Sequence, residues 1–352
     1  MQSEPGEPPL THIGIIGGGN ISETHARAVR EIEGVEISAF FGINEAKVAR
    51  LTQLFGGVAY HGLEYFLNHK PMDLVIVGSP SGLHAEQGIA AAQRGLHVLV
   101  EKPIDITTAR ADELIEACEQ AGVKLGVCFQ DRFSPDIYRV KQMIDSGQLG
   151  RPILASGSVR WYRPPEYYST SRWRGTLGLD GGGALINQAI HTIDLLLWLM
   201  GDVKRVCAIK RTALHEIDVE DTLVATLEFG NGAIGSFEAA TSVYPGYDRR
   251  IDLTGTEGTI IVEQDRIARC DLKTGPFEHV ASSEESANLR TSSPVISDVR
   301  GHRRVVADFL QAIETNGRAR CDGQEGRRSI ALVQAIYESA QTVKPVVLTG
   351  LP

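Results

Sequence analysis

Apolar strands and helical segments alternate along the first third of the chain, and this alternation restricts the fold more than any other feature. Short runs rich in Val, Ile and Leu predict strands at residues 13–17, 36–41, 74–80, 97–103 and 125–129. Segments of helical period lie between most of them, at residues 22–33, 45–55, 83–94 and 107–121. Near-continuous apolar strands are typical of sheets covered on both faces, and strand–helix alternation predicts a parallel, doubly wound sheet. Residues 12–130 are therefore expected to form one α/β domain.

The pattern changes after residue 130. A helix at 135–147 precedes longer predicted strands at 220–229, 233–241 and 250–263, and helices return at 301–315 and 325–341. Asn231-Gly232 lies between two of these strands and is a strong hairpin signal. The polar stretch Ser282–Ser293 is expected to be a surface loop. Residues 131–348 are therefore predicted to form a second, α+β domain with a large, mainly antiparallel open sheet.

Composition narrows the class of protein. The 352 residues carry a formal net charge of -9, and Lys and Arg are scattered, so we expect no nucleic-acid partner. The five cysteines lack a C-x-x-C spacing, which is typical of a reduced, cytoplasmic protein. Residues 1–11 are acidic and proline-rich, unlike a signal peptide, and are expected to be a flexible tail. The longest apolar run, Ile193–Met200, is far shorter than the ~20 residues that cross a bilayer.

The first predicted strand runs directly into a glycine-rich loop. Residues 17–22 match G-x-G-x-x-G except that Ser22 takes the place of the third glycine. Small residues let a pyrophosphate approach the N-terminus of the following helix, whose free amides and dipole favour anions. The loop predicts a Rossmann domain, in which Gly17, Gly19, Asn20 and Ile21 contact a dinucleotide cofactor.

The second predicted strand ends without an acidic residue. An aspartate or glutamate there usually binds the ribose 2′-hydroxyl of NAD, but this chain has Gly42 and Asn44, both expected at the cofactor. Gly42 leaves room for a 2′-phosphate with Lys47 or Arg50 nearby, whereas Asn44 is able to bind the hydroxyl. NAD and NADP therefore both stay open.

Two further predicted strands end in polar residues, at the edge where open α/β sheets bind ligands. Ser79 and Pro80 follow one strand, His84 lies just beyond them, and Glu101 and Lys102 follow another. We expect all five at the cofactor, with Lys102 also facing the substrate. Ordinary N-capping of the next helix by Ser81 explains the first segment equally well, and His84 is also typical of a structural histidine. Glu101 either orients Lys102 or caps its strand.

Three polar residues share one face of an otherwise apolar helix that follows Gly181-Gly182-Gly183. The spacing of Asn187, His191 and Asp194 places them on one helical stripe. An imidazole with an ordinary pKa of about 6.5 suits proton transfer at neutral pH. Asp194 either orients that imidazole or only extends the polar patch. The stripe has no second histidine four residues away, so we expect no metal site.

The loop before the glycine run combines aromatic and cationic side chains. Flat rings suit the apolar face of a sugar, and the arginines at 163, 172 and 174 indicate an anionic substituent. The alternative is that the rings pack under the loop or at a subunit interface. The residues expected at the substrate are Trp161, Tyr162, Arg163, Trp173 and Arg174, together with Lys102, Asn187 and His191.

Taken together, these motifs resemble those of the glucose-fructose oxidoreductase and inositol dehydrogenase (Gfo/Idh/MocA) family over residues 13–348. The resemblance rests on the glycine loop, Ser79-Pro80 with His84, Glu101-Lys102-Pro103, and the glycine run followed by Asn187, His191 and Asp194. It implies a Rossmann domain, a substrate-binding α/β domain whose open sheet often builds homodimers or homotetramers, and NAD(P)-linked chemistry on sugars and cyclitols.

By this resemblance Lys102 and His191 match the family's catalytic lysine and histidine, whereas Asn187 replaces its usual aspartate. An amide does not carry a proton as a carboxylate would, but it still hydrogen-bonds a substrate hydroxyl. In this respect the chain is similar to family members that oxidise the 3-hydroxyl of UDP-N-acetylglucosaminuronate.

We therefore predict an NAD(P)-dependent dehydrogenase that acts on a secondary hydroxyl of a sugar, sugar derivative or cyclitol. His191 is expected to be the acid/base, Lys102 to stabilise the alkoxide and Asn187 to orient the substrate. Two alternatives stay open: a non-catalytic dinucleotide-binding sensor, and a redox-neutral enzyme that holds NAD tightly.

Overall fold

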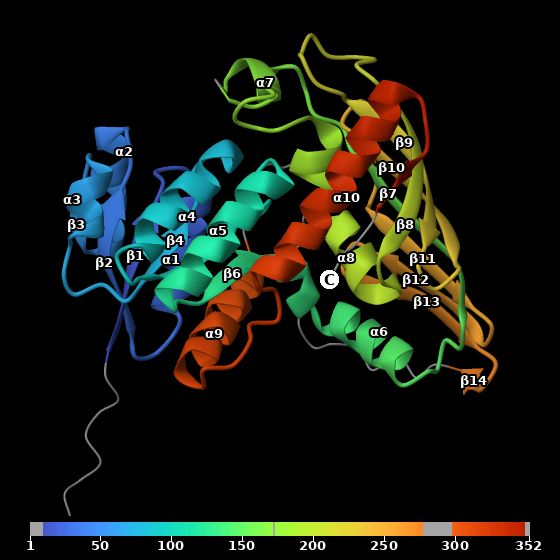
Figure 1. Cartoon of the computed structure of the whole chain (residues 1–352), viewed down its shortest axis with the longest axis horizontal. Helices are drawn as coiled ribbons and strands as arrows, with labels where there is room; N and C mark the ends of the chain where they lie inside the picture. The colour runs from blue at the N-terminus through green and yellow to red at the C-terminus, as the bar shows by residue number, and fades with distance from the viewer. Residues whose placement is uncertain (1–9, 172, 277–297, 349–352) are drawn as a thin grey trace, which may run out of the picture.

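The computed structural model describes residues 10–171, 173–276 and 298–348, which form two sheets with helices between and around them (Figure 1). Almost all of the expected tail over 1–11 and the whole expected surface loop Ser282–Ser293 lie outside these residues. Thr11 already belongs to the first strand.

The first sheet has six parallel strands in the order β3-β2-β1-β4-β5-β6, the arrangement of a Rossmann domain. Its strands are β1 (Thr11–Ile16), β2 (Val35–Phe41), β3 (Val58–Tyr60), β4 (Leu74–Val77), β5 (His97–Glu101) and β6 (Leu125–Cys128). Its helices are α1 (Asn20–Arg30), α2 (Glu45–Phe55), α3 (Leu63–Leu67), the 3-10 turn η1 (Ser81–Leu83), α4 (His84–Ala92) and α5 (Thr108–Ala121). The alternation of elements was predicted correctly except for β3 and α3, because a three-residue edge strand without a fully buried position leaves no apolar run.

The second sheet has nine strands in the order β14-β13-β12-β11-β7-β10-β9-β8-β15. Neighbouring strands are antiparallel except β7 and β10, which are parallel, so the expectation of a mainly antiparallel sheet is confirmed. The strands are β7 (Pro152–Arg160), β8 (Val203–Arg211), β9 (Thr222–Phe229), β10 (Ile234–Ala240), β11 (Arg250–Gly255), β12 (Gly258–Glu263), β13 (Arg266–Leu272), β14 (Gly275–Pro276) and β15 (Val346–Val347). The Asn231-Gly232 hairpin joins β9 to β10 as predicted.

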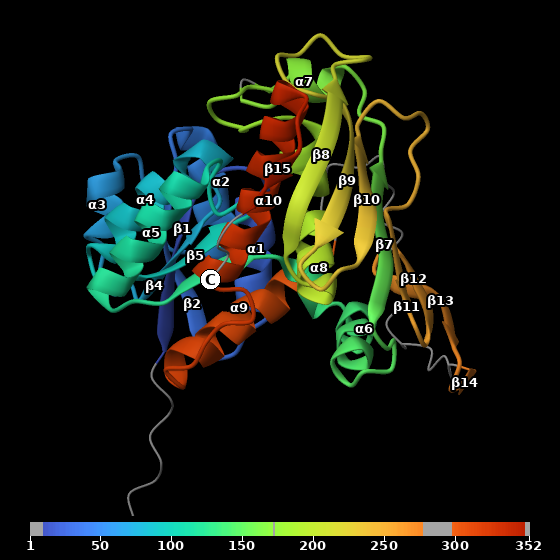
Figure 2. The same ribbon diagram turned by 45° about the vertical axis from the view of Figure 1, so that its right-hand side comes forward.

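The second half contains further helices, and the long one at residues 323–342 lies between the two sheets (Figures 1 and 2). They are the 3-10 turn η2 (Gln130–Phe133), α6 (Pro135–Asp145), α7 (Glu166–Ser169), the π-helical turn η3 (Ala184–Ala189), α8 (Ile190–Met200), α9 (Arg300–Glu314) and α10 (Gly323–Thr342). Helix α10 contacts β8 and α8 on one side and α5 and β6 on the other, and α9 packs against α1. The end of the chain therefore returns to the first domain. No helix in the described parts of the chain combines the length and the hydropathy needed to cross a bilayer.

Candidate active site

The glycine loop lies between β1 and α1, as the motif predicted. Gly17 has φ of +124°, and a Cβ there would lie 2.5 Å from the Ser22 Oγ and 2.6 Å from the Gly78 carbonyl oxygen. A Cβ on Gly19 would meet no atom within 4 Å, so this side of the loop is open. Gly19 is the N-cap of α1, and because glycine has no side chain, no side-chain oxygen caps the first amides of the helix. The loop therefore offers an anion free helix amides and space, which fits the pyrophosphate of a dinucleotide.

A cavity of about 740 Å³ runs from this loop to the second sheet. All residues expected at the cofactor line it: Gly17, Gly19, Asn20, Ile21, Gly42, Asn44, Ser79, Pro80, His84, Glu101 and Lys102. So do the residues expected at the substrate, except one: Lys102, Trp161, Arg163, Trp173, Arg174, Asn187 and His191. The exception is Tyr162, whose ring packs edge-on against Tyr244 at 5.2 Å and is not part of the lining.

Gly42 and Asn44, both predicted at the cofactor ribose, also have structural roles at this end of the cavity. A Cβ on Gly42 would lie 2.8 Å from Val48 Cγ2, so packing against α2 already requires glycine there. The Asn44 side chain caps α2 by accepting a hydrogen bond from the Lys47 amide at 3.0 Å. Of the two basic residues expected near a 2′-phosphate, Arg50 pairs with Glu23 at 2.8 Å, and Lys47 lines the cavity. These contacts fit either cofactor.

His84 joins the ends of two strands. Its buried ring lies between two carbonyl oxygens, with Nδ1 2.7 Å from that of Pro103 and Nε2 2.9 Å from that of Ser79. These contacts hold the loop after β4 against the loop after β5. His84 is therefore a brace between two cavity-lining loops.

Glu101 lies in a buried polar cluster beneath Lys102. Its carboxylate receives a hydrogen bond across 2.7 Å from His25 Nε2 and one from the Lys102 backbone amide at 3.2 Å. One polar atom of each of four side chains, a ring nitrogen, a carboxylate oxygen or a sulfur, lies within 4.8 Å of the others; these are His25, Glu101, Cys128 and His302. Burial alone would raise the pKa of Glu101, but the hydrogen bond from His25 and the nearby His302 and Lys102 lower it below its usual range. Glu101 therefore accepts from the backbone of the turn that presents Lys102, a contact that fits both roles that the sequence left open.

The Lys102 side chain reaches across the cavity to the glycine-run helix. Its Nζ donates a hydrogen bond to the backbone carbonyl of Asn187 at 2.9 Å. That carbonyl belongs to η3, a π-helical turn, where the sequence predicted regular α-helix. Single π turns inside helices are frequent at functional sites because they displace side chains and carbonyls from the regular ladder. Burial lowers the pKa of Lys102, and the charges of Glu101, Asp180 and Asp131 oppose this effect.

The residue beside His191 is Asp131, not Asp194. His191 Nδ1 lies 3.5 Å from Asp131 Oδ2, and Arg249 holds the same carboxylate oxygen in an ion pair. Burial lowers the pKa of His191 to about 3 although Asp131 raises it, so the imidazole is neutral at physiological pH. Burial raises the pKa of Asp131, but Arg249 and His191 together hold it at about 2.

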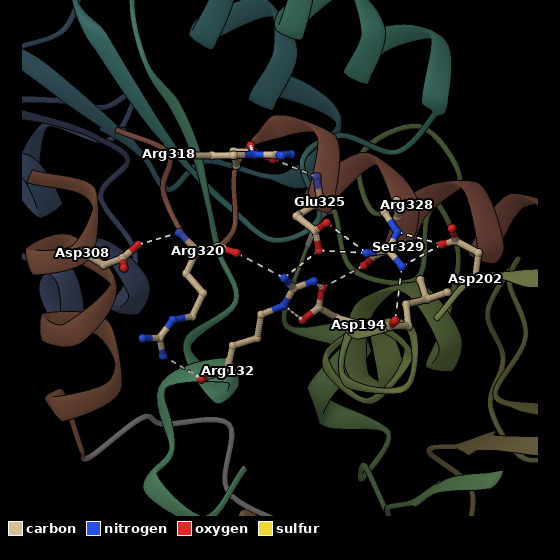
Figure 3. A network of polar contacts seen from close by, with 11 residues as sticks. Arg132, Asp194, Asp202, Asp308, Arg318, Arg320, Glu325, Arg328 and Ser329 are labelled. Carbon is tan, nitrogen blue, oxygen red and sulfur yellow. Dashed lines mark hydrogen bonds and ion pairs between the residues drawn. The ribbon is translucent and has the colours of Figure 1, made fainter. Parts of the chain in front are cut away.

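The predicted polar stripe is wrong at Asp194. After the π turn, α8 directs Asp194 to Arg132, with two contacts of 2.7 Å, in a buried network with Glu325, Arg328 and Ser329 (Figure 3). Trp198, one turn on, also lies against the Arg132 guanidinium, 5.4 Å from its carbon. Asn187 and His191 line the cavity and Asp194 does not, because His191 and Asp194 are three residues apart in α8 and point about 60° apart around its axis.

Arginines and aromatic rings gather at the substrate end of the cavity. The Arg163 guanidinium lies 5.1 Å from the Trp161 ring and 5.3 Å from that of Tyr167. Arg174 lies 4.2 Å from the Tyr167 ring and 5.7 Å from that of Trp173. Arg172 lies outside the described residues. Planar guanidinium groups against rings suit a sugar that carries an anionic group.

A Rossmann sheet of this strand order, a glycine loop open to an anion, and a lysine and a histidine lining the same cavity define a nicotinamide-dependent oxidoreductase. The chain belongs to the Gfo/Idh/MocA family. Residues 11–129 match the model "Oxidoreductase family, NAD-binding Rossmann fold", and residues 137–261 match the model of the GFO/IDH/MocA C-terminal domain. The predicted family, fold and NAD-type cofactor are thereby confirmed.

Known relatives in this family are sugar and cyclitol oxidoreductases. The structure of the WlbA dehydrogenase from Bordetella pertussis in complex with NADH and UDP-GlcNAcA is 32% identical, with a TM-score of 0.87 and coverage of 98% of this chain and 100% of that one. Myo-inositol 2-dehydrogenase of Thermotoga maritima is 29% identical over 96% of this chain and 98% of its own length. The 1,5-anhydro-D-fructose reductase of Ensifer adhaerens is 28% identical over 94% of this chain and 96% of its own.

Proposed function

We propose that this protein is an NAD(P)-dependent oxidoreductase that transfers a hydride between the cofactor and a secondary hydroxyl of a sugar derivative. The observation that carries the proposal is the position of Lys102 and His191, which line one cavity with the glycine loop. Gly17, Gly19, Asn20 and Ile21 would hold the pyrophosphate, and Ser79, Pro80 and His84 lie further along the same edge of the sheet. When bound, the nicotinamide supplies the hydride acceptor or donor.

His191 is the acid/base of this proposal. Because burial keeps its imidazole neutral, it is able to take the hydroxyl proton as the alcohol is oxidised, and Asp131 at 3.5 Å favours the imidazolium that results. Lys102 places its ammonium in the same cavity and stabilises the developing alkoxide. In the reverse direction, the imidazolium returns the proton to the carbonyl oxygen.

We infer that the substrate carries an anionic group, such as a uronate carboxylate or a nucleotide diphosphate. Arg163 and Arg174 lie at the end of the cavity formed by the second domain, each against an aromatic ring. WlbA, crystallised with NADH and UDP-GlcNAcA, spans nearly all of this chain, so that nucleotide sugar is the first compound to test.

The proposal is tested by cofactor titration followed by a substrate panel. NADH and NADPH are titrated separately by fluorescence, and turnover is then followed at the nicotinamide absorbance with UDP-GlcNAcA, neutral hexoses, inositols and free uronates. Turnover on an anionic sugar supports both the function and the substrate class. Binding of cofactor without turnover on any compound contradicts the dehydrogenase and favours a sensor. Turnover without net NADH, with cofactor that survives gel filtration, favours the redox-neutral enzyme.

Arg174 allows the substrate class to be tested separately from the chemistry. We expect R174Q to raise KM for UDP-GlcNAcA by about 10-fold or more, since a charge-assisted hydrogen bond is lost, while kcat changes little. R160Q is the matched control, because Arg160 is half exposed and pairs with Glu238 on the second sheet. An unchanged KM in R174Q removes Arg174 from substrate recognition.

The open sheet is the proposed interface for a homodimer or homotetramer. Four apolar side chains on neighbouring strands β7 to β10 are 48–61% exposed, and they are Leu154, Ile209, Val224 and Ile234. Ile209 pairs with Val224 and Ile234 with Leu154, so they form adjoining pairs. Light scattering after gel filtration tests this proposal, because I209K is expected to shift an oligomer toward the monomer.

A further inference from the structure

Asp180 is a buried carboxylate on the loop just before the glycine run, and no motif in the sequence marks it. It is only 2% exposed. Its Oδ2 accepts a hydrogen bond from the Gly175 amide at 2.8 Å, and its Oδ1 accepts one from the side-chain amide of Asn187. A carboxylate taken out of water is costly unless something nearby requires it. The groups around Asp180 therefore indicate its role.

Four ionisable side chains from three segments interact with Asp180. Lys102 approaches from the end of β5, Arg174 from the same loop as Asp180, and Tyr167 and Tyr168 from α7. Burial raises the pKa of Asp180 to about 6, against the hydrogen bonds from Gly175 and Asn187 and the positive charges of Lys102 and Arg174. At pH 7 and above, the carboxylate is ionised, and its negative charge favours the ammonium form of Lys102, whose Nζ donates to the carbonyl of the same Asn187 that Asp180 binds.

The hydrogen bond to Asp180 also fixes the Asn187 amide. An ionised carboxylate only accepts hydrogen bonds, so the Nδ2 of Asn187 must face Asp180 and its Oδ1 must face away. That Oδ1 accepts a hydrogen bond from Gln188 Nε2 at 2.6 Å. Gln188 in turn accepts a hydrogen bond from the Arg163 guanidinium at 2.8 Å and donates one to the Tyr167 hydroxyl at 2.7 Å. A single ordered chain of polar contacts thus runs from Asp180 to the arginine at the substrate end.

We propose that Asp180 is a positioning residue for the reaction, which keeps the Lys102 ammonium charged and locks the Asn187 amide in one orientation. This role rests on the proposed function, since it acts through two residues that line the cavity beside His191. Asp180 itself is not among the lining residues and touches the substrate only through them. Asp180 and Asn187 together supply one carboxylate and one amide. The tests below ask whether it matters which of the two positions carries the carboxylate.

The first test needs neither substrate nor cofactor. Pulse labelling of the protein alone with acetic anhydride at a series of pH values, followed by mass spectrometry of the Lys102 peptide, gives the pH at which Lys102 becomes half reactive. In D180N we expect this midpoint to fall by about 0.5–1 pH unit, because the ammonium loses a nearby negative charge. D112N is the control, since Asp112 lies on α5 and pairs with Arg327. An unchanged midpoint in D180N overturns the proposal.

The second test exchanges the two groups. D180N replaces the carboxylate with an amide of the same shape, and we expect kcat to fall by about 10-fold or more while NADH binding is retained. N187D places two carboxylates in contact, and we expect it to lose activity above pH 7 and to recover part of it as the pH falls. The double variant D180N/N187D restores one carboxylate and one amide, and we expect kcat within about 3-fold of the parent.

Each outcome of the exchange decides the proposal. Recovery in the double variant supports it, because a carboxylate that only held the loop through Gly175 would not be replaced by one at position 187. A double variant no more active than D180N overturns it, provided that both melt at the parent's temperature. If the parent protein turns over no sugar, the proposed function fails, and the labelling experiment still decides whether Asp180 keeps Lys102 charged.

Discussion

Arg132 and Asp194 form a buried, bidentate ion pair that joins the turn η2 to helix α8. Arg132 donates from Nε to Oδ2 and from its second terminal nitrogen to Oδ1, each at 2.7 Å, and both side chains are only 1% exposed. Helix α10 completes the arrangement, since Ser329 donates to Asp194 at 3.1 Å and Glu325 accepts from Arg132 at 2.8 Å (Figure 3). The pair thus fixes the helix that carries His191.

Removal of one partner should therefore destabilise the protein strongly. We expect D194N to lower the free energy of unfolding by about 3–5 kcal/mol, because Arg132 keeps its charge in a buried site. D202N is the matched control, since Asp202 pairs with Arg328 at 2.7 Å but its side chain is 40% exposed. Its loss should cost at most about 1 kcal/mol. Urea unfolding measures both, and equal effects would contradict the role of the buried pair.

Lys102 and His191 should each be required for turnover and dispensable for cofactor binding. We expect K102A and H191A to lower kcat by about 10²–10⁴-fold, which is the usual contribution of a general acid/base or a charged stabiliser. NADH affinity should stay within a few-fold of the parent, because the glycine loop is untouched. K141A serves as control, since Lys141 pairs with Asp145 on α6. Full turnover in either variant would remove that residue from the mechanism.

Much of the cofactor half of the site could be predicted because local rules govern it. In a parallel sheet the ends of the strands meet at one edge, so residues after β1, β2, β4 and β5 converge wherever the strands are recognised. Gly17, Ser79 and Lys102 were found in this way, and all three line the cavity. The same rule would have found Asp131, because η2 directly follows β6 at that edge.

Arg249, which holds Asp131 beside His191, could not be predicted in this way because its position depends on long-range packing. Arg249 lies 118 residues from Asp131 in sequence and meets it only when the chain is folded. The π turn at Ala184–Ala189 is also invisible to a helical wheel, which assumes 3.6 residues per turn and so placed Asn187 on one stripe with His191 and Asp194. His191 and Asp194 are three residues apart in regular α-helix, so their side chains point about 60° apart, and Asp194 pairs with Arg132. Asn187 donates instead to Asp180.

The two glycines of the loop should respond differently to alanine. G17A places a Cβ 2.5 Å from the Ser22 Oγ at a residue with φ of +124°, so we expect a loss of about 2 kcal/mol or more of stability as well as of NADH binding. A Cβ on Gly19 meets nothing within 4 Å, so G19A should melt like the parent. It should still weaken NADH binding by about 10-fold, because the methyl group occupies the space offered to the pyrophosphate. Unweakened binding in G19A would place the pyrophosphate elsewhere.

Acid should destabilise the protein partly through His302, in the cluster beneath Lys102. Burial, with the nearby His25, lowers the pKa of His302 to about 4 although Glu101 and Asp131 oppose this effect. Between pH 6.5 and 4 the unfolded chain therefore binds a proton at this residue that the folded protein does not, so stability is full above pH 6.5 and falls as the pH falls.

H302Q removes that proton uptake while it keeps a polar side chain. We expect the slope of the unfolding free energy against pH to become shallower by up to about 1.4 kcal/mol per pH unit over this range. Urea unfolding at half-unit steps from pH 4.5 to 7.5 measures the slope, and the difference between variant and parent above pH 7 gives the constant packing cost of the substitution. A variant whose stability falls as steeply as the parent's would show that His302 is protonated in the folded protein. In that case the cluster around Glu101 would hold an additional positive charge beneath Lys102.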